Sequence, residues 1–360
     1  MPERSIIGWD IGGAHVKACL LQDGQVTDVA QWACPLWQGM DRLDAVLQAA
    51  WQRWSAMAQA QHAVTMTGEM VDLFADREQG VMAISGALAR SLEGPVRFFA
   101  GDAGWLRDAE LPAHWGDVAS ANWLATARHA AQAVGTGLLV DIGSTTTDLV
   151  AFIDGRVATR SRTDAQRLAS GELVYHGVVR TPLCAVARRI DWRGQPHNVM
   201  NEFFATSADV YRLTGELDPD HDLHPSADNA AKDADATRQR LARMIGLDRR
   251  DAPASDWLAF AQAWRAVQLE VLRAEMLRVM AAHGLPDDAA VVGAGCGAFL
   301  VDSLVPSDAG AGRPRRPRLD YGNDVAPVSP HAVGGSPAVR AWARVCAPCV
   351  AVASLLCMDR

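Results

Sequence analysis

Lysine is almost absent from this chain of 360 residues, because only Lys17 and Lys232 of its 34 basic residues are lysine. Acidic residues outnumber basic ones, and the formal net charge is −8 at pH 7. A chain of this charge has no broad basic surface for nucleic acid or an anionic membrane. We therefore expect small-molecule substrates and neither a nucleic-acid nor a membrane partner, and the sequence leaves a homodimer open. The rarity of lysine makes both lysines candidate functional residues.

Long apolar runs and paired cysteine motifs are also lacking. No stretch approaches the roughly twenty apolar residues that a membrane span needs. The seven cysteines are scattered, and Cys346 and Cys349 form a single C-x-x-C in an expected helix. Without a second pair, this spacing favours a face of small residues over a zinc or redox site. A strand pattern begins within five residues of the first, which leaves no room for a signal peptide, so we expect a cytoplasmic protein.

The chain does contain one short phrase twice. The segments "IGWDIGGAHVKACL" (7–20) and "LVDIGSTTTDLV" (139–150) align at an offset of 131 residues, so that Asp10 coincides with Asp141. Identical residues occur at six of the seventeen positions from the aspartate onward. The sequence therefore predicts an internal repeat rather than two unrelated turns.

Each copy of the phrase opens a run of three antiparallel strands. Asp23-Gly24 and Asp154-Gly155 predict a type I′ turn between the second and third strands. Alternating helices and strands then follow in each half, with helices expected at 43–57, 120–134 (capped by Ser120), 255–283 and 337–358, and strands at the start of 63–70, at 96–100 and at the start of 289–301. The pattern predicts two copies of one mixed α/β unit around a cleft, with domains at 1–130 and 131–336 and a last helix, 337–360, packing across both.

The repeated phrase has the chemistry of a phosphate clamp. A strand that ends in Asp-x-Gly and a tight turn brings bare backbone amides close to a ligand, and the amides form an anion-binding nest. The second copy adds hydroxyl donors. The carboxylates at the strand ends could hold Mg²⁺, directly or through water. We expect phosphate at Gly12, Gly13, Gly143, Ser144, Thr145 and Thr146, and Mg²⁺ at Asp10 and Asp141.

Other phosphate motifs fit less well. The chain has no G-x-x-x-x-G-K-[ST], and "GAGCGA" (293–298) matches a dinucleotide fingerprint but comes late, without a following strand that ends in an acid. In a two-lobed clamp this turn would instead approach the organic end of a phosphorylated ligand. We therefore expect substrate contacts at Gly293, Gly295 and Gly297.

Two Asp-x-Gly hairpins with a late Gly-x-Gly turn resemble the actin/sugar-kinase/Hsp70 superfamily, which implies two ribonuclease-H-like domains around a phosphate-binding cleft. A longer series of strings runs along nearly the whole chain and is more specific: "DIGGAHVKA", "TMTGEMVDLF", "ASANWLATA", "DIGSTTTDLV", "GELVYHGVVRTPL", "NEFFATSADVYRLTG", "RQRLARMIGLD" and "GAGCGAFL". Together they resemble a hydantoinase/oxoprolinase-related family, the methylofuran (or methanofuran) biosynthesis condensing enzymes of tetrahydromethanopterin-linked one-carbon metabolism.

The resemblance implies an activity that needs no ATP. An (aminomethyl)furanylmethyl group would pass from its diphosphate to the phenol oxygen of γ-glutamyl-tyramine, forming an aryl ether and releasing diphosphate. The segment "HPSADNAAK" (224–232) departs from the family pattern and leaves substrate contacts there in doubt. The neighbouring acids and histidines of 218–224 suit an acidic solvated loop better than a metal cluster.

The departing diphosphate needs neutralisation by Mg²⁺, by the amide nests and by a cation. Lys17 is the expected cation, although it could also be an exposed edge-strand lysine, and Asp148 stands at the repeat-equivalent position. A base for the phenol, whose pKa is about 10, is useful but need not act first. The candidates are Glu172, Glu69, Asp148 and His176; Arg180 and Thr181 could meet an anionic group such as the glutamyl carboxylates.

Two other functions remain open from the sequence. One is an ATP-dependent small-molecule kinase, or a hydantoinase-like ring-opening enzyme, with the same clamp on ATP. The other is a regulatory ATPase of the same superfamily, which the lack of an additional binding or polymerisation domain disfavours.

Overall fold

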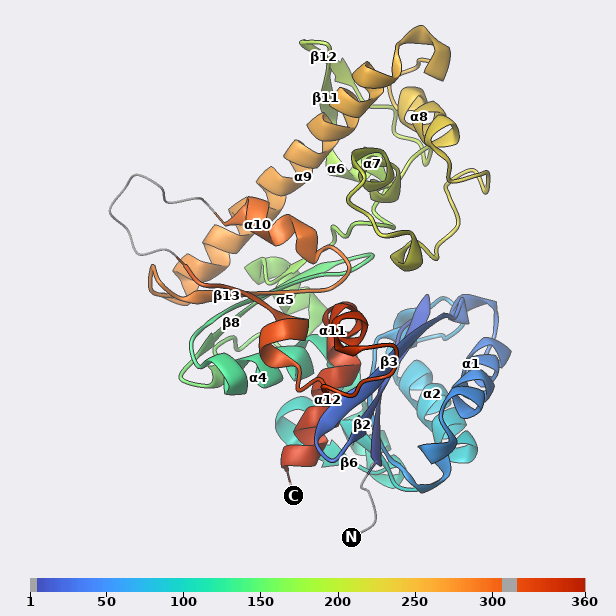
Figure 1. Ribbon diagram of the computed structural model, residues 1–360, viewed down its shortest axis with the longest axis vertical. Helices are drawn as coiled ribbons and strands as arrows, with labels where there is room; N and C mark the ends of the chain where they lie inside the picture. The colour runs from blue at the N-terminus through green and yellow to red at the C-terminus, as the bar shows by residue number, and fades with distance from the viewer. Residues whose placement is uncertain (1–4, 306–315, 360) are drawn as a thin grey trace. The chain divides into compact units, whose positions relative to one another are not determined.

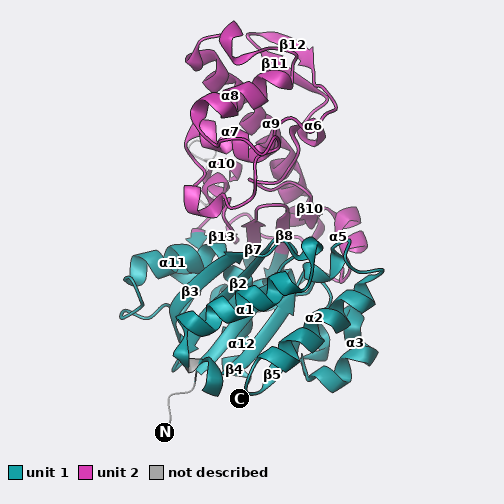
Figure 2. Ribbon diagram, turned by 90° about the vertical axis from the view of Figure 1, so that its right-hand side faces the viewer, with its two compact units in different colours: residues 1–137, 151–159, 319–360 teal, residues 138–150, 160–318 magenta. Residues whose placement is uncertain are grey.

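The computed structural model describes residues 5–305 and 316–359 and divides into two compact units (Figures 1 and 2). Unit 1 comprises residues 1–137, 151–159 and 319–360, and unit 2 comprises residues 138–150 and 160–318. Both units are therefore discontinuous in the sequence. This division differs from the contiguous domains expected at 1–130 and 131–336, because the C-terminal segment belongs to unit 1 with the N-terminal residues.

Unit 1 is built on a six-stranded sheet in the order β3-β2-β1-β4-β5-β6. The first three strands are antiparallel, whereas β4 and β5 run parallel to β1. The central β1 is buried on both faces. The strands are β1 (Ser5–Ile11), β2 (His15–Gln22), β3 (Gln25–Ala33), β4 (Gln61–Met66), β5 (Val96–Phe99) and β6 (Trp105–Leu106).

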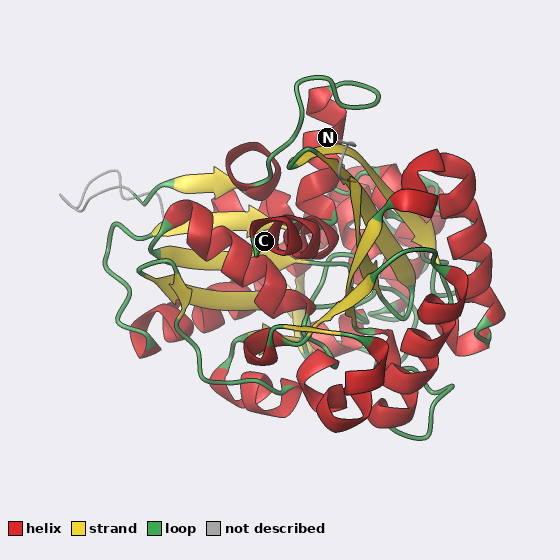
Figure 3. Cartoon of the chain, turned by 90° about the horizontal axis from the view of Figure 1, so that it is seen from below, coloured by secondary structure: helices red, strands yellow, loops and turns green. Residues whose placement is uncertain are grey.

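Helices cover both faces of the unit 1 sheet (Figure 3). The alternation of β1 sends Ile7, Trp9 and Ile11 into one core with buried residues of α1 and α2. Gly8 faces the opposite side, where a Cβ atom would lie 2.0 Å from the carbonyl oxygen of Cys349 in α12. The helices of unit 1 are α1 (Asp41–Arg53), α2 (Arg77–Ser91), α3 (Leu111–Val118), α4 (Asn122–Val134), α11 (Ser336–Val345) and α12 (Ala347–Met358).

The last helix expected from the sequence is two helices, α11 and α12, that meet at Cys346. Pro348 stands in the first turn of α12, where its missing N–H and its ring prevent α11 from continuing. Within the described residues, no single helix is long and apolar enough to span a bilayer; α11 and α12 meet that test of length and composition only together, bent by 100°. Helix α12 packs on β1, β2, β4 and α4, all within unit 1.

Ser120 does not cap α4, contrary to the sequence-based expectation. Helix α4 begins at Asn122, and its N-cap residue, Ala121, makes no side-chain cap. Ser120 has a positive φ of 51° and donates a hydrogen bond to Glu69, 51 residues earlier in the chain. The Ser120 hydroxyl therefore bonds to a residue distant in the sequence, whereas the local pattern predicted a bond to the first turn of α4.

Unit 2 contains most of a second sheet, in the order β10-β8-β7-β13-β14, with β9 also paired to β8. Taking β7, β8, β9, β13 and β14 as the counterparts of β1 to β5 gives the same strand order as in unit 1. The Asp-Gly turns agree as well: φ is 48° and 79° at Asp23-Gly24, and 51° and 74° at Asp154-Gly155, as a type I′ turn requires. The internal repeat is thus a structural repeat. The strands are β7 (Gly137–Ile142), β8 (Thr147–Ile153), β9 (Arg156–Val157), β10 (Leu173–Val174), β13 (Ala290–Ala294) and β14 (Arg318–Asp320).

The 29-residue helix α9 (Ala254–Ala282) is the longest helix of unit 2, and α6, α7, α8, α10 and the β11–β12 ribbon pack on it. Side-chain caps begin several of the shorter helices: Thr163 and Thr206 form capping boxes, and Asp233 accepts a hydrogen bond from Ala236 N. The remaining elements are α5 (Asp164–Ser170), α6 (Leu183–Val186), α7 (Ser207–Thr214), α8 (Ala234–Arg243), α10 (Val301–Leu304), β11 (Arg189–Trp192) and β12 (Gln195–Asn198).

Candidate functional site

The turn between β7 and β8 carries the second Asp-x-Gly phrase in unit 2. Gly143 N donates to Thr146 O (2.8 Å), which closes the turn after Asp141 at the end of β7. The turn residues are half-buried, and the hydroxyls of Ser144 and Thr145 lie 3.5 Å apart. Backbone amides and two hydroxyl groups are thus gathered at the end of one strand, as an anion nest requires.

The loop that contains His176 to Thr181 closes on this turn. Val178 N donates to Gly143 O (3.1 Å), and Arg180 N donates to Ser144 O (2.8 Å). Gly177 lies so close that a Cβ atom there would be 2.4 Å from the carbonyl carbon of Ser144. Only a residue without a side chain permits this approach, so the glycine sets the distance between loop and turn.

A second set of hydrogen bonds fixes the loop from behind. The buried Thr181 hydroxyl accepts from Gly177 N (2.8 Å), and the carbonyl oxygen of Gly177 accepts from Gln268 Nε2 (2.9 Å) in α9. Gln268 Oε1 in turn accepts from Tyr211 OH (2.9 Å). The hydroxyl of Thr181, a residue expected to bind substrate, therefore forms hydrogen bonds within the loop. Gly177 and Gln268 were not selected from the sequence; the former lay inside the family-like string "YHGVVR", whereas nothing local signalled the latter.

Arg180 places its side chain at the turn. Its Nη1 donates to Thr145 Oγ1 (3.3 Å). Within residues 5–305 and 316–359 no carboxylate forms an ion pair with this guanidinium. Burial lowers the pKa of Arg180 from its ordinary value. The half-buried cation thus has a neutral hydroxyl as its partner on the turn.

The glycine-rich turn after β13 also packs against the β7–β8 turn. Gly297 N donates to Ile142 O (2.8 Å). Gly295 has φ +82°, and a Cβ atom there would lie 2.5 Å from Asp141 Oδ1 and 2.2 Å from Ile142 O. Gly293 instead faces Val301, 3.2 Å from where its Cβ would stand. The glycine at 295 keeps the space beside the Asp141 carboxylate clear of any side chain.

A strand-end carboxylate beside a side-chain-free turn and amide groups suits Mg²⁺, which prefers one or two carboxylates together with water and substrate phosphates. The half-buried Asp141 therefore fits the expected role of a magnesium ligand. Within the described parts of the chain no three His, Cys, Asp or Glu side chains converge as a complete protein-only metal site. Any Mg²⁺ here would need ligands from the substrate or from water.

The equivalent turn of unit 1, between β1 and β2, repeats these backbone bonds. Gly12 N donates to His15 O (3.0 Å), as Gly143 does in the second copy, and Thr67 N donates to Ile11 O (2.9 Å), as Gly297 does to Ile142. The loop after β4 lies against this turn, because a Cβ atom on Gly13 would be 2.6 Å from Val71 Cγ1. The structural repeat therefore includes the turns and not only the strands.

Asp10 and Lys17 are cross-strand partners in unit 1. They face each other in the antiparallel register of β1 and β2, and Thr65 of β4 stands beside Asp10 on the other side. Lys17 Nζ donates to the carbonyl oxygen of Val345, at the end of α11 (3.2 Å). Lys17 lies in unit 1 and Asp148 in unit 2, so the expectation that both face one cleft stays a prediction.

The carboxylates expected to serve as bases in unit 2 are engaged elsewhere. Asp148 Oδ1 accepts from Arg167 Nη2 (2.7 Å), and burial raises the pKa of Asp148 while the arginine lowers it, with the rise larger. Glu172 is buried and accepts from Ser170 Oγ (2.9 Å) while its other oxygen lies 2.9 Å from His283 Nε2. The arginine that neutralises Asp148 was not recognised from the sequence.

Glu69 in unit 1 is also buried. It accepts hydrogen bonds from Ser120 Oγ (2.7 Å) and Arg77 Nη2 (3.3 Å), and burial raises its pKa. His176 differs from these carboxylates: it is half-buried, burial lowers its pKa, and its Nδ1 has no hydrogen-bond partner among the described residues. The imidazole is therefore neutral near pH 7 and has one ring nitrogen unused.

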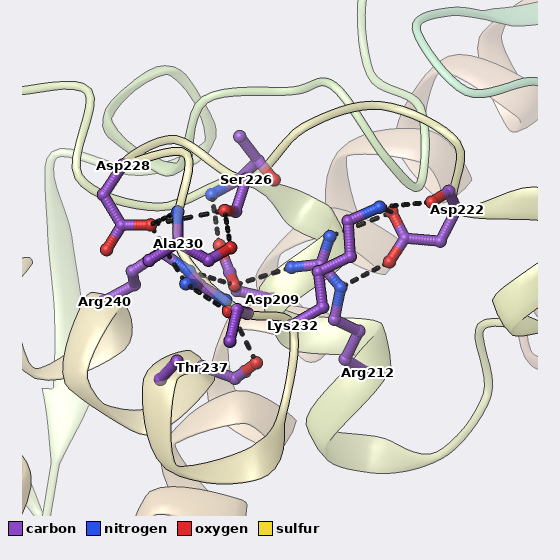
Figure 4. A network of polar contacts seen from close by, with 12 residues as sticks. Asp209, Arg212, Asp222, Ser226, Asp228, Ala230, Lys232, Thr237 and Arg240 are labelled. Atoms are coloured by element: carbon purple, nitrogen blue, oxygen red, sulfur yellow. Dashed lines mark hydrogen bonds and ion pairs between the residues drawn. The ribbon is translucent and has the colours of Figure 1, made fainter. Parts of the chain in front are cut away.

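Ion pairs hold the loop that follows α7 (Figure 4). Asp222 accepts from Arg212 Nε (2.5 Å) and lies 3.2 Å from Lys232 Nζ. Arg240, whose side chain is fully buried, donates to Asp209 (2.7 Å) and Asp228 (3.1 Å). These pairs tie the segment containing residues 222–232 to α7 and α8.

Comparisons with known proteins place these features in a family. The sequence model for hydantoinase/oxoprolinase proteins matches residues 61–307. A protein of Methanocaldococcus jannaschii is 29% identical over 283 residues, which cover 78% of this chain and 84% of the relative. A protein of Methanococcus vannielii is 30% identical over 151 residues, which cover 41% of this chain and 66% of the relative. Both carry the name (4-{4-[2-(gamma-L-glutamylamino)ethyl]phenoxymethyl}furan-2-yl)methanamine synthase.

Among solved structures, nucleotide-free acetone carboxylase superposes with a TM-score of 0.50 at 11% identity, over 81% of this chain and 65% of that one. This likeness concerns the fold alone. Together with the repeated strand order, it identifies the two-domain α/β fold of the actin/sugar-kinase/Hsp70 superfamily, as expected from the Asp-x-Gly turns. Because the family model covers more than half of the sequence, the chain belongs to the hydantoinase/oxoprolinase family.

Proposed function

We propose that this protein is an ether synthase of methanofuran or methylofuran biosynthesis, which joins an (aminomethyl)furanylmethyl diphosphate to the phenol of γ-glutamyl-tyramine. The observation that carries the proposal is the β7–β8 turn with the 176–181 loop closed on it. The turn offers backbone amides and two hydroxyls, and the loop adds the guanidinium of Arg180. The two archaeal relatives support the choice of reaction, because the product in their name contains a phenoxymethyl-furan ether. We place the reaction in the cytoplasm, with small molecules as its partners.

The reaction exchanges one carbon–oxygen bond for another. The bond between the furanylmethyl carbon and the diphosphate breaks, and its electron pair leaves with the diphosphate. The phenol oxygen then supplies the pair for the new bond to the same carbon, and the phenol proton passes to a base. The furan ring can delocalise positive charge at the methylene carbon, so the leaving group is the main charge that the protein must stabilise.

The leaving diphosphate would lie on the second turn and meet the backbone of Ser144 to Thr146 together with the hydroxyl groups of Ser144 and Thr145. Gly143 N already donates to Thr146 O, so its part is to shape the turn. A magnesium ion, when bound, would be held by Asp141, with Asp10 as the equivalent residue of unit 1, and would supply charge neutralisation for the phosphate oxygens.

His176 is the base that we favour. Asp148, Glu172 and Glu69 are committed to ion pairs or hydrogen bonds inside their units. His176 begins the loop that closes on the turn, its imidazole is neutral near pH 7, and one nitrogen is unused among the described residues. A neutral imidazole can accept the proton of a phenol as the phenol oxygen attacks.

The proposal is tested by incubating the purified protein with the synthetic furanylmethyl diphosphate and γ-glutamyl-tyramine, with Mg²⁺ and without nucleotide. We expect the aryl ether by mass spectrometry and an equal amount of inorganic diphosphate. The monophosphate donor should react poorly because monophosphate is the weaker leaving group. Activity that appears only with ATP, with ADP as a product, would contradict the proposal and favour a kinase of the same fold.

A further inference from the structure

Arg180 contacts the β7–β8 turn through both its backbone and its side chain. Its backbone N–H donates to Ser144 O (2.8 Å), its guanidinium donates to Thr145 Oγ1 (3.3 Å), and the whole residue is half-buried. The backbone and the side chain of one arginine thus both hold the β7–β8 turn.

The charge of Arg180 lacks a counterion in the described parts of the chain. Three buried or half-buried arginines of unit 2, Arg167, Arg212 and Arg240, each meet a carboxylate within 3.1 Å. The half-buried Arg273 donates to the backbone carbonyl oxygens of Ser303 and Leu304. Arg180 instead donates to a neutral hydroxyl. Burying a cation without a paired charge costs free energy. An anion bound beside Arg180 would remove this cost.

We propose that Arg180 is the cation that binds the diphosphate on the β7–β8 turn and neutralises its charge as it leaves. A planar guanidinium suits this role because its forked donors match two oxygens of a phosphate group. The position beside Thr145, one of the hydroxyls of the nest, favours the diphosphate over the glutamyl carboxylates that the sequence suggested as its partners.

The assignment changes the role expected for Lys17. Lys17 Nζ donates to the Val345 carbonyl in unit 1, and its strand partner is the carboxylate Asp10. Its charge therefore already has an acceptor and a neighbouring acid within its own unit. Arg180, in the loop that closes on the β7–β8 turn, lies beside the Ser144 and Thr145 residues of that turn, so the anion would meet amides, hydroxyls and cation in one unit.

The anchoring of the loop explains how Arg180 stays in place. Gln268 and Thr181 bind the two polar groups of the Gly177 backbone, and Gly177 packs on the turn itself. A donor that is already oriented needs no reorganisation when charge develops. Removal of one such preorganised donor lowers kcat about 10²–10³-fold in other enzymes, and we expect a loss in that range for Arg180→Gln.

The test measures binding of inorganic diphosphate, with Mg²⁺, to the purified full chain by isothermal titration calorimetry. Arg180→Gln should weaken binding at least about tenfold, a change of about 1.4 kcal/mol, and Arg180→Lys should restore part of it. Arg250→Gln is the matched control, because Arg250 loses the same charge from a side chain that is 83% exposed. The urea midpoint of each variant checks that the fold survives.

Unchanged diphosphate affinity in a folded Arg180→Gln protein would overturn the inference, and so would an equal loss in Arg250→Gln. Only the naming of the anion as a leaving group rests on the proposed function, and the two can fail separately. Ether synthesis with no effect of Arg180 on diphosphate binding would refute the inference alone. Arg180-dependent diphosphate binding in a protein that makes no ether would refute the proposed function alone.

Discussion

Replacement of Gly177 by alanine tests whether close contact between the 176–181 loop and the β7–β8 turn, here called the clasp, is needed for stability and for diphosphate binding. The added Cβ atom would lie 2.4 Å from the Ser144 carbonyl carbon, 2.5 Å from Thr145 N and 2.6 Å from Gly143 O. All three are backbone atoms, which cannot rotate away as a side chain can. An ordinary contact needs about 3.4 Å or more, so loop and turn must separate by about 1 Å.

The free-energy cost has two sources, the steric strain of the added methyl group and the weakening of the hydrogen bonds between loop and turn. Overpacking of a well-packed site by one methyl group costs about 1–3 kcal/mol. The bonds Val178 N to Gly143 O and Arg180 N to Ser144 O would lengthen, at a cost of about 0.5–1.5 kcal/mol each. We therefore expect Gly177→Ala to lower the free energy of unfolding by about 2–6 kcal/mol. Because Arg180 moves with the loop, diphosphate affinity should fall at least about tenfold.

Urea unfolding and diphosphate titration together measure both effects. Gly116→Ala is the control: it makes the same chemical change in α3, where a Cβ atom meets nothing within 4 Å. We expect it to leave diphosphate binding unchanged and to keep or slightly raise stability, since alanine is the better helix former. If Gly177→Ala matched the wild type within about 0.5 kcal/mol, a difference typical of neutral surface changes, and bound diphosphate normally, the clasp would have no role.

Three further changes test other parts of the structure. Asp209→Ala should destabilise the protein by about 3–5 kcal/mol in urea unfolding, because it leaves the fully buried Arg240 without its 2.7 Å partner; a loss below about 1 kcal/mol, the range of exposed ion pairs, would contradict this reading of the network. His62 and His129 are buried with pKa values lowered by burial to about 4, so the unfolded chain binds more protons between pH 6.5 and 4, and stability should fall as the pH drops through that window. His62→Gln should reduce this slope, and an unchanged slope would mean that other groups cause it. Asp141→Asn should cut turnover by orders of magnitude while the urea midpoint holds, and near-wild-type turnover in the folded variant would exclude this carboxylate from the reaction.

The repeat was the part of the fold that could be predicted from the sequence. Gly and Asp-Gly turns are encoded locally, because only certain residues adopt positive φ at little cost. Asp23 and Asp154 accordingly take nearly the same conformation, 131 residues apart. The long α9 helix was equally readable from its spacing of apolar residues, with bounds of Ala254–Ala282 against the expected 255–283.

Features that depend on distant partners could not be read in this way. The Ser120 hydroxyl binds Glu69 instead of α4, and Asp148 pairs with Arg167 of α5. Neither partner has a fixed spacing that a sequence pattern would reveal. The counterion of a buried charge is a tertiary property, so candidate bases were proposed that the fold uses for other contacts. His176, which keeps a nitrogen unused, could be ranked only once its surroundings were known.

Because α12 packs on β1, unit 1 can complete its core only after the end of the chain has been synthesised. On the ribosome, β1 emerges early, but the helix that covers its Gly8 face begins at Ala347. The first segment of unit 1 ends at residue 137. At about 5–20 residues per second, the ribosome needs roughly another 10–40 s to reach α12. During this interval the apolar surface that α12 will cover has no native partner. The nascent chain is therefore expected to need a chaperone at this stage, and synonymous codons that slow the second half of the message should lower the yield of native protein more than those that slow the first.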